Sequence, residues 1–503
     1  MKKDVIAKIF IITFICFNLL LLDNSPEIIL TDASTYILLG KSILLRQGYR
    51  QIWSVDNEKY TATAVMLPLL LTPIIYFFGY NFLMMKLLCI LMAAGALWII
   101  YRLFRIISDE WTALLILIFT GASYQFIYYC HRVLTEIPYL LFSLMAITFI
   151  GHYKYSEDIK FNKTLIAAVF FTLVAYFTRP IGISLAAAIL VYFLFERKPN
   201  QIFPLFLKNI IILGFFIFIP IILWESRNYN SSGWGGIARV KLVIEGINPL
   251  NVTQRFTLFE TALHSIYAYV FYAYPKILLG IQFAKRTVIA LIVTTITFYG
   301  FLYCLAKRRR VIEYYVIFFM LLLFFWPWSV SAGARFIVPI IPFIFYYFII
   351  GMREISRFVK GKEDLKKGLL IFLIALLLFV NIKETVLLAT NKEDLHGYSQ
   401  KQLEGFLGMV KWVKENTQEN AIFASSADSP IYLYFGRRTI EIPLLTETGQ
   451  LMNIINTTNV NYAIIISTVP YTKYFLQPLI NRNLDRFIEV YRKNDNAIYQ
   501  VKR

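Results

Sequence analysis

The chain has 503 residues, of which 58% are hydrophobic, and it carries a formal net charge of +19. This apolar fraction, with a mean hydropathy of +0.60, excludes an ordinary soluble protein. The charge excess is not a nucleic-acid signal, because the Lys and Arg residues lie mostly in short loops, where they set membrane topology and contact anionic headgroups.

Apolar runs of bilayer-spanning length recur through the first 390 residues and predict a polytopic α-helical membrane protein. The short alternating segments of a transmembrane barrel are absent from the sequence. We expect about eleven spans, the first a retained signal anchor because no small-residue cleavage site follows it. The predicted spans are 5–22, 82–104, 112–130, 137–153, 163–178, 181–196, 203–224, 283–306, 311–328, 336–352 and 368–388.

Segment 62–78 is harder to assign, because it is apolar but interrupted by Pro68 and Pro73. We interpret it as a juxtamembrane or re-entrant helix that does not cross the bilayer. With that choice every basic cluster between the spans falls on one side, which the positive-inside rule makes cytoplasmic. The N-terminus is then inside and the C-terminus outside.

Three regions are predicted to lie outside the cytoplasm: the loops 23–81 and 225–282, and the tail. Residues 1–390 would form the transmembrane domain, and 391–503 a separate extracytoplasmic α/β domain of a size that can fold as a unit. The elements predicted in this tail are a helix at 401–415, buried strands at 421–425 and 462–467, and a hairpin of 486–491 and 497–501 around Asn494-Asp495-Asn496.

Two acids stand out at the outer ends of the first and third spans. Asp32 directly precedes a predicted helix at 33–46, and Glu136 opens the span at 137–153 beside His131 and Arg132. Each has a structural alternative: Asp32 as a helix N-cap, Glu136 as an interfacial acid favoured by the helix dipole. The functional interpretation is proton chemistry at the mouth of a helical bundle.

Three arginines, Arg179, Arg227 and Arg335, lie at the outer ends of spans, where the positive-inside rule does not place them. Interfacial snorkelling is the alternative for each one singly. Together they predict an anionic ligand, because the planar guanidinium group offers paired donors to phosphate. His264 and His396 are isolated and show no metal-ligand spacing. No metal residues are therefore assigned and no cofactor is required, although a divalent metal ion stays open.

The sequence resembles the GT-C membrane glycosyltransferases, in particular the family 39 protein mannosyltransferase-like enzymes and the lipid A aminoarabinose transferases. The motifs that carry the resemblance are Asp32 with Tyr36, Phe77-Phe78-Gly79, Thr135-Glu136-Ile137-Pro138, Thr178-Arg179-Pro180, Arg335 with Pro339 and Pro342, Trp412-Val413-Lys414-Glu415-Asn416-Thr417 and Gly436-Arg437-Arg438. The sequence departs from the relatives at Ala33, where they often have Glu, and Glu58 is the nearest acid before the proline-interrupted segment.

The resemblance implies a polyprenyl-phosphate-linked sugar donor and transfer at the outer face of the cytoplasmic membrane. Asp32 would be the general base of an inverting transfer, Arg335 and then Arg179 would stabilise the leaving phosphate, and Glu136 would orient the acceptor. Arg227 is a further phosphate candidate, and Tyr36, Glu58, His131 and Arg132 are acceptor or loop candidates. The partners would be membrane lipids and an acceptor lipid, glycan or protein.

Two alternatives stay open at this point. A polymerase or ligase of surface polysaccharide uses the same lipid carriers, and a lipid-linked sugar transporter or flippase would carry the donor without transferring the sugar. The transporter alternative expects related halves with broken helices near the midplane, and no second copy is evident in the sequence.

Overall fold

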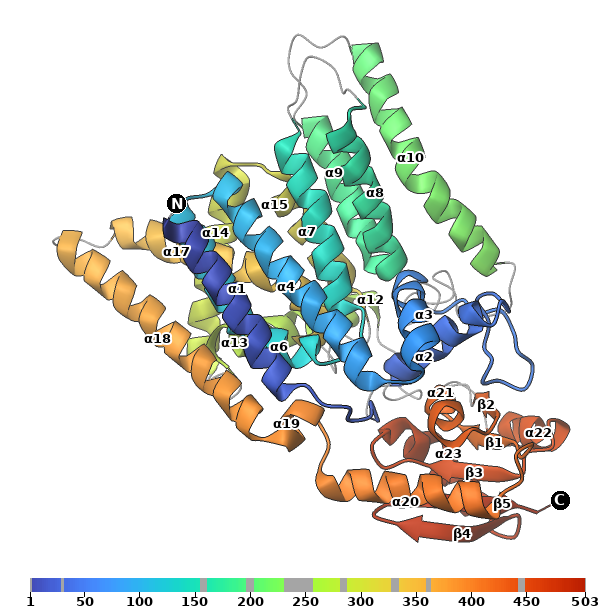
Figure 1. Ribbon diagram of the computed structural model, residues 1–503. Coiled ribbons are helices and arrows are strands. Elements are labelled where there is room, and N and C mark those ends of the chain that lie inside the picture. The colour runs from blue at the N-terminus through green and yellow to red at the C-terminus, as the bar shows by residue number, and fades with distance from the viewer. Residues whose placement is uncertain are drawn as a thin grey trace.

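The computed structural model describes residues 2–28, 31–153, 161–195, 203–229, 257–280, 287–326, 334–358, 363–441 and 448–502. A bundle of long helices makes up most of the molecule, and a small domain with a β-sheet lies at one end of it, next to α2 (Thr31–Leu44) (Figure 1). This arrangement confirms the predicted fold class of a helical membrane protein with a small C-terminal α/β domain.

In the ranges that the structure describes, six helices are long and apolar enough to cross a membrane. They are, with the short 3-10 turn η3 (Val338–Ile340) counted as the start of α17, α1 (Lys2–Leu21), α4 (Phe82–Ile107), α10 (Phe203–Tyr229), α14 (Thr287–Lys307), α17 (Ile341–Phe358) and α18 (Glu363–Thr390). Four other predicted spans coincide with shorter apolar helices: α7 (Glu136–His152), α8 (Lys163–Thr178), α9 (Ile183–Phe195) and α15 (Val311–Phe324). The protein is therefore a multi-pass membrane protein.

The span predicted at 112–130 is not one straight helix. It is a pair, α5 (Glu110–Gly121) and α6 (Tyr124–Cys130), bent by 59°. Gly121 lies against α1, and a Cβ there would come within 2.7 Å of the Phe10 ring. Ser123 then takes an extended backbone, which ends one helix before the next begins. A continuous apolar run does not reveal such a bend.

The region predicted as an outer loop at 225–282 is partly helical. Helix α10 continues to Tyr229, and the chain then forms α12 (Leu258–Ala268), the π-helical turn η2 (Tyr269–Ala273) and α13 (Tyr274–Leu279). A capping box between Thr257 and Glu260 begins α12. Residues 230–256 and 281–282 of the predicted loop lie outside the described residues.

Helix α3 (Met66–Phe78) corresponds to the segment predicted not to cross the bilayer. Its 13 residues extend about 20 Å, short of the roughly 30 Å of bilayer hydrocarbon. It packs against α2 at Gly40, where a Cβ would come within 2.9 Å of the Pro68 carbonyl oxygen. Both helices lie at the end of the bundle that faces the C-terminal domain (Figure 1).

Three ion pairs join helix termini at the opposite end of the bundle. Lys3 contacts Glu110 at 3.3 Å, Arg105 contacts Asp4 at 2.6 Å, and Arg353 contacts Asp109 at 3.7 Å. Basic clusters that lie far apart in the sequence therefore gather at one end, as the predicted topology requires.

The C-terminal domain contains a five-stranded sheet in the order β2-β1-β3-β5-β4. Its elements, after the connecting helix α19 (Lys392–His396), are α20 (Gln400–Asn416), β1 (Phe423–Ser425), α21 (Asp428–Pro430), the π-helical turn η4 (Ile431–Phe435), β2 (Thr439–Glu441), α22 (Thr448–Thr457), β3 (Tyr462–Ile465), α23 (Pro470–Arg482), β4 (Phe487–Lys493) and β5 (Asn496–Val501). Strands β1, β2 and β3 are parallel, and β5 pairs antiparallel with β3 and β4.

The predicted hairpin around Asn494 is confirmed. Lys493 pairs with Asn496, and the two turn residues Asn494 and Asp495 have φ of 49° and 62°. Asn and Asp tolerate this left-handed conformation better than other non-glycine residues, which explains why the sequence signal was readable.

Candidate active site

Two acids and an arginine from distant parts of the chain form a connected ion-pair network. Arg335, in the short helical segment 334–336 before η3, donates from Nε to Glu136 Oε1 at 2.6 Å and from Nη2 to Asp32 Oδ2 at 2.7 Å. Asp32 lies in the first turn of α2 and Glu136 in the first turn of α7, where unpaired backbone N–H groups favour negative charge. The structure thus brings together the two acids and the arginine that the sequence singled out.

A second arginine reaches the same acid. Arg179 follows α8 in an extended conformation, just before η1 (Pro180–Gly182), and its Nη1 lies 3.0 Å from Glu136 Oε1. This contact is an ion pair without the geometry of a hydrogen bond. The Arg179 guanidinium also lies over the Phe336 ring, 5.7 Å from its centroid. Glu136 therefore holds two guanidinium groups side by side.

The four charged side chains differ in their access to solvent. Glu136 is fully buried and Asp32 is 42% exposed, while Arg179 and Arg335 are 14% and 15% exposed. Two guanidinium groups and two carboxylates leave the cluster formally neutral. The Asp32 carboxylate and the edges of the two arginines lie on the solvent-facing side of the cluster. The Glu136 carboxylate contacts the arginines on the buried side.

Tyr36 lies one helical turn after Asp32 and is only 5% exposed, packed in the bundle core. The buried Tyr36 side chain therefore packs beside the two acids. Glu58 lies exposed in the outer loop, where its backbone oxygen accepts a hydrogen bond from the Gln51 N–H at 2.8 Å. The structure gives the Glu58 carboxylate no contact with the ion-pair network among the described residues.

Arg227 lies at the end of α10 and is occupied by the outer loop. It donates to the backbone oxygens of Tyr60 at 2.9 Å and Tyr49 at 3.1 Å, and stacks over the Trp224 ring at 4.9 Å. These contacts fasten the loop to the bundle. Arg227 therefore positions the outer loop. Binding of phosphate by Arg227 stays a prediction.

His131 and Arg132 are buried in the turn between α6 and α7. His131 Nε2 lies 2.9 Å from Asn18 Oδ1 of α1, and Arg132 donates to Glu27 Oε2 at 3.0 Å. The side chains of Arg132 and Glu27 are 3% and 1% exposed. His131 thus connects this turn to α1, and Arg132 connects it to the segment before α2.

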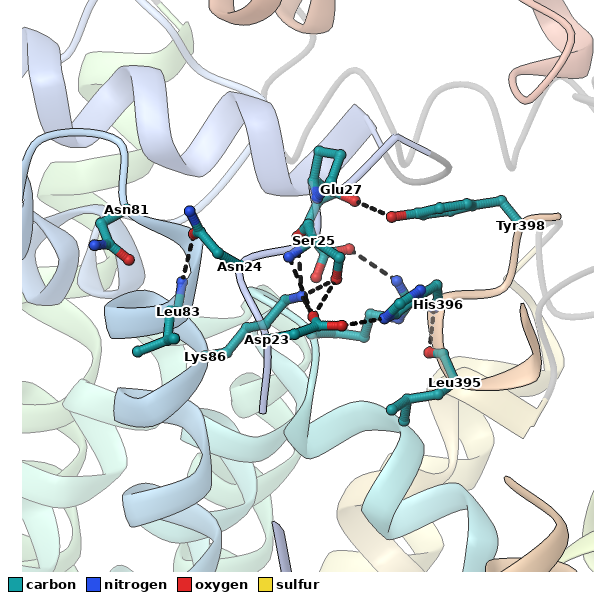
Figure 2. A network of polar contacts seen from close by, with 12 residues as sticks. Asp23, Asn24, Ser25, Glu27, Asn81, Leu83, Lys86, Leu395, His396 and Tyr398 are labelled. Carbon is teal, nitrogen blue, oxygen red and sulfur yellow. Dashed lines mark hydrogen bonds and ion pairs between the residues drawn. The ribbon is translucent and has the colours of Figure 1, made fainter. Parts of the chain in front are cut away.

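A neighbouring polar network ties the C-terminal domain's connection to the bundle (Figure 2). His396 Nε2 lies 2.7 Å from Asp23 Oδ2, and Lys86 donates to Ser25 Oγ at 2.6 Å. Burial favours the neutral acid, but the hydrogen bonds from His396 and Ser25 outweigh it and hold the pKa of Asp23 well below its usual range. A lysine inside an apolar span is itself a signal of function or structure, so Lys86 could have been found from the sequence.

The C-terminal domain also contacts the first turn of α2, which carries Asp32. Ser429 Oγ lies 2.8 Å from Thr35 Oγ1, and Trp53 Nε1 donates to Asp428 Oδ2 at 2.6 Å. Burial raises the pKa of Asp428, although the hydrogen bonds from the Ser429 N–H and from Trp53 oppose the shift. These pairs are separated by hundreds of residues and carry no sequence signal.

Within the ranges that the structure describes, no group of three or more His, Cys, Asp or Glu side chains is arranged to hold a metal ion. His396 bonds Asp23, as above, and His264 Nδ1 lies 2.8 Å from the Glu260 backbone oxygen of its own helix. The divalent metal left open by the sequence gains no support from these residues.

Comparisons with known proteins bear on the fold and the family. The family model described as dolichyl-phosphate-mannose-protein mannosyltransferase matches residues 62–224. No curated protein matches the sequence. Among solved structures, ArnT from Cupriavidus metallidurans bound to undecaprenyl phosphate aligns with a TM-score of 0.56 at 13% identity, covering 99% of this chain and 97% of its own. The Archaeoglobus fulgidus oligosaccharyltransferase in the apo form aligns with a TM-score of 0.58 at 12% identity, covering 91% and 69%.

The protein therefore has the fold of the GT-C membrane glycosyltransferases, as the sequence motifs predicted. The match to the mannosyltransferase family model covers residues 62–224, which include Glu136 and Arg179 of the ion-pair network.

Proposed function

We propose that the protein transfers a sugar from a polyprenyl-phosphate-linked donor to an extracytoplasmic acceptor, with inversion and with Asp32 as general base. The observation that carries the proposal is the Asp32–Arg335–Glu136 network, in which the one well-exposed carboxylate shares an arginine with a buried one. The ArnT structure that this fold resembles holds undecaprenyl phosphate, which favours a lipid donor of that class.

The movement of negative charge during the reaction explains why a single arginine should join the two acids. The acceptor oxygen attacks the anomeric carbon, its proton passes to Asp32, and the bond to the lipid phosphate breaks. Negative charge then leaves Asp32 and appears on the phosphate, which changes from a monoanion to a dianion. Arg335 lies next to Asp32. When Asp32 becomes neutral on taking the proton, Arg335 would release it, and the Arg335 guanidinium group would turn to the charge that develops on the leaving phosphate.

The second arginine has a matching role. Arg179 contacts Glu136 without a well-formed hydrogen bond, so its donors are available to a phosphate oxygen at small cost. Glu136 balances the two positive charges before the donor binds. Because Glu136 is buried, it is better placed to hold the arginines than to contact the acceptor. The acceptor side is then formed by Asp32 and the outer loop that Arg227 fastens.

Orientation follows from the basic helix ends. We propose that the end with Lys3, Arg105 and Arg353 faces the cytoplasm, which places Asp32 and the C-terminal domain outside the cytoplasmic membrane. A lipid donor in the outer leaflet then presents its phosphate at the level of the arginines.

The decisive experiment is turnover by purified protein with radiolabelled polyprenyl-phosphate-linked sugars and candidate acceptors. Asp32→Asn should lower kcat by about 10²- to 10⁴-fold, the usual contribution of a general base. Glu419→Gln, which neutralises an exposed acid of the C-terminal domain with no assigned role, is the matched control and should keep wild-type turnover. Full transfer by Asp32→Asn would show that the base is assigned wrongly.

The same assay separates the two alternatives. A transporter or flippase would retain intact donor with no turnover. A polymerase or ligase would yield a lengthened or ligated polysaccharide where the proposed transferase adds a single sugar, and mass spectrometry of the product distinguishes them.

A further inference from the structure

A groove at the far end of the bundle is not used by the proposed chemistry. It has a volume of about 510 Å³ and is lined by Phe195, Leu302, Leu305, Ala306, Arg309 and Tyr314. Helix α9 begins at Ile183, next to the active-site turn, and ends at Phe195. Its 13 residues carry the chain about 20 Å away from that turn, so the groove lies at the end where the basic helix termini gather.

The groove follows from how α14 packs. Gly300 and Gly351 draw α14 and α17 so close that a Cβ on Gly300 would lie 2.0 Å from the Tyr347 backbone oxygen. Residues 302, 305 and 306 lie on the opposite face of α14 by helical periodicity, and Arg309 follows the end of that helix. The side of α14 that faces away from α17 is therefore separated from α9 and α15. Apolar side chains line the space between them.

Arg309 differs from its basic neighbours. Arg308 and Arg310 both donate to Tyr346 Oη, at 2.5 Å and 3.4 Å. In the parts of the chain that the structure describes, the Arg309 side chain makes no hydrogen bond or ion pair, and it borders the groove. Its backbone has φ of 44°, a left-handed conformation uncommon for a residue other than glycine and often kept at ligand sites.

We propose that this groove binds an anionic phospholipid of the adjacent leaflet, with an acyl chain along the apolar wall and the phosphate on Arg309. Charge complementarity selects the occupant: apart from the Tyr314 hydroxyl the wall is apolar, and the mouth offers the Arg309 guanidinium group, which has no hydrogen-bond or ion-pair partner among the described residues. The Phe195 and Tyr314 rings, stacked at 5.8 Å and 3°, form a flat surface on which a chain can lie. Under the proposed orientation this is the cytoplasmic leaflet, and the site is independent of the transfer reaction.

Native mass spectrometry of the detergent-purified full chain, titrated with phosphatidylglycerol or phosphatidylcholine, tests the proposal. Wild type should retain one phosphatidylglycerol in preference to phosphatidylcholine. Arg309→Gln should weaken retention by about tenfold, the value of one charge-assisted contact. Leu302→Trp should weaken it by filling the groove.

Lys307→Gln is the matched control, because Lys307 is an exposed cation two residues away that does not line the groove. It should retain phosphatidylglycerol like wild type. If Arg309→Gln folds poorly, Arg309→Gly removes the same side chain and relieves the left-handed backbone. Equal losses in Lys307→Gln and Arg309→Gln would reduce the site to diffuse surface charge and overturn the proposal. Equal retention of phosphatidylcholine, or tighter retention of added undecaprenyl phosphate, would overturn it as well.

Discussion

At the scale of single residues, the two acids of the proposed active site are chemically alike but differ in burial. Glu136 is fully buried between two arginines, whereas Asp32 is 42% exposed and contacts one of them. Both acids and the arginines could be predicted from the sequence, because they lie at the outer ends of spans, where the positive-inside rule does not place arginine. It could not rank them by burial, because burial depends on how α2, α7 and the turn at Arg335 come together.

This difference in burial predicts that Glu136 contributes more to stability and Asp32 more to activity. Glu136→Gln leaves two arginines without their shared anion and should cost about 3–5 kcal/mol, the range for breaking a buried pair. Asp32→Asn breaks a partly exposed pair whose arginine keeps Glu136, so it should cost about 1 kcal/mol or less while lowering kcat about 10²- to 10⁴-fold. Thermal unfolding of both variants in the same detergent measures this. Equal losses of stability would mean that Asp32, too, is a structural anchor.

At the scale of elements, the apolar pattern predicted most helices and the hairpin around Asn494, because period and turn residues are local signals. The bend between α5 and α6 escaped prediction because it depends on the approach of Phe10 to Gly121. The docking of α21 against α2 escaped it for the same reason: Ser429 and Thr35 are ordinary polar residues until the fold brings them together.

That docking should steady Asp32. The hydroxyls of Thr35 and Ser429 and the Thr31 carbonyl lie within 2.8 to 3.3 Å of one another, so each hydroxyl proton has a partner beside Asp32. Thr35→Val and Ser429→Ala should each speed hydrogen exchange in the first turn of α2 and lower kcat, with a coupling of about 0.5–3 kcal/mol between them. Ser426→Ala is the control, because its buried hydroxyl has no hydrogen-bond partner among the described residues. Strictly additive effects would show that the two hydroxyls do not act together.

At the scale of the whole molecule, the contact between bundle and C-terminal domain has two parts. One is the docking of α21 and the outer loop, where Ser54 pairs with Thr439 beside the sheet. The other is the polar network of Asp23, Lys86 and His396 (Figure 2). The first lies beside the proposed active site. The second joins Asp23, which follows α1, to Lys86 of α4 and His396 of α19, so the domain is held to the bundle at two points.

The second part should depend on pH through Asp23. Its pKa is lowered in the folded protein, so its contribution to stability is present above the unfolded value near 4 and is lost as the pH falls toward the folded value. Asp23→Asn should therefore melt below wild type by a constant margin from about pH 8 to pH 5, and the margin should narrow below about pH 4. Limited proteolysis should show faster cutting near α19 in the variant over the same upper range. A margin that persists unchanged down to pH 3 would mean that the charge of Asp23 does not hold the domain, and that its hydrogen bonds as a neutral group suffice.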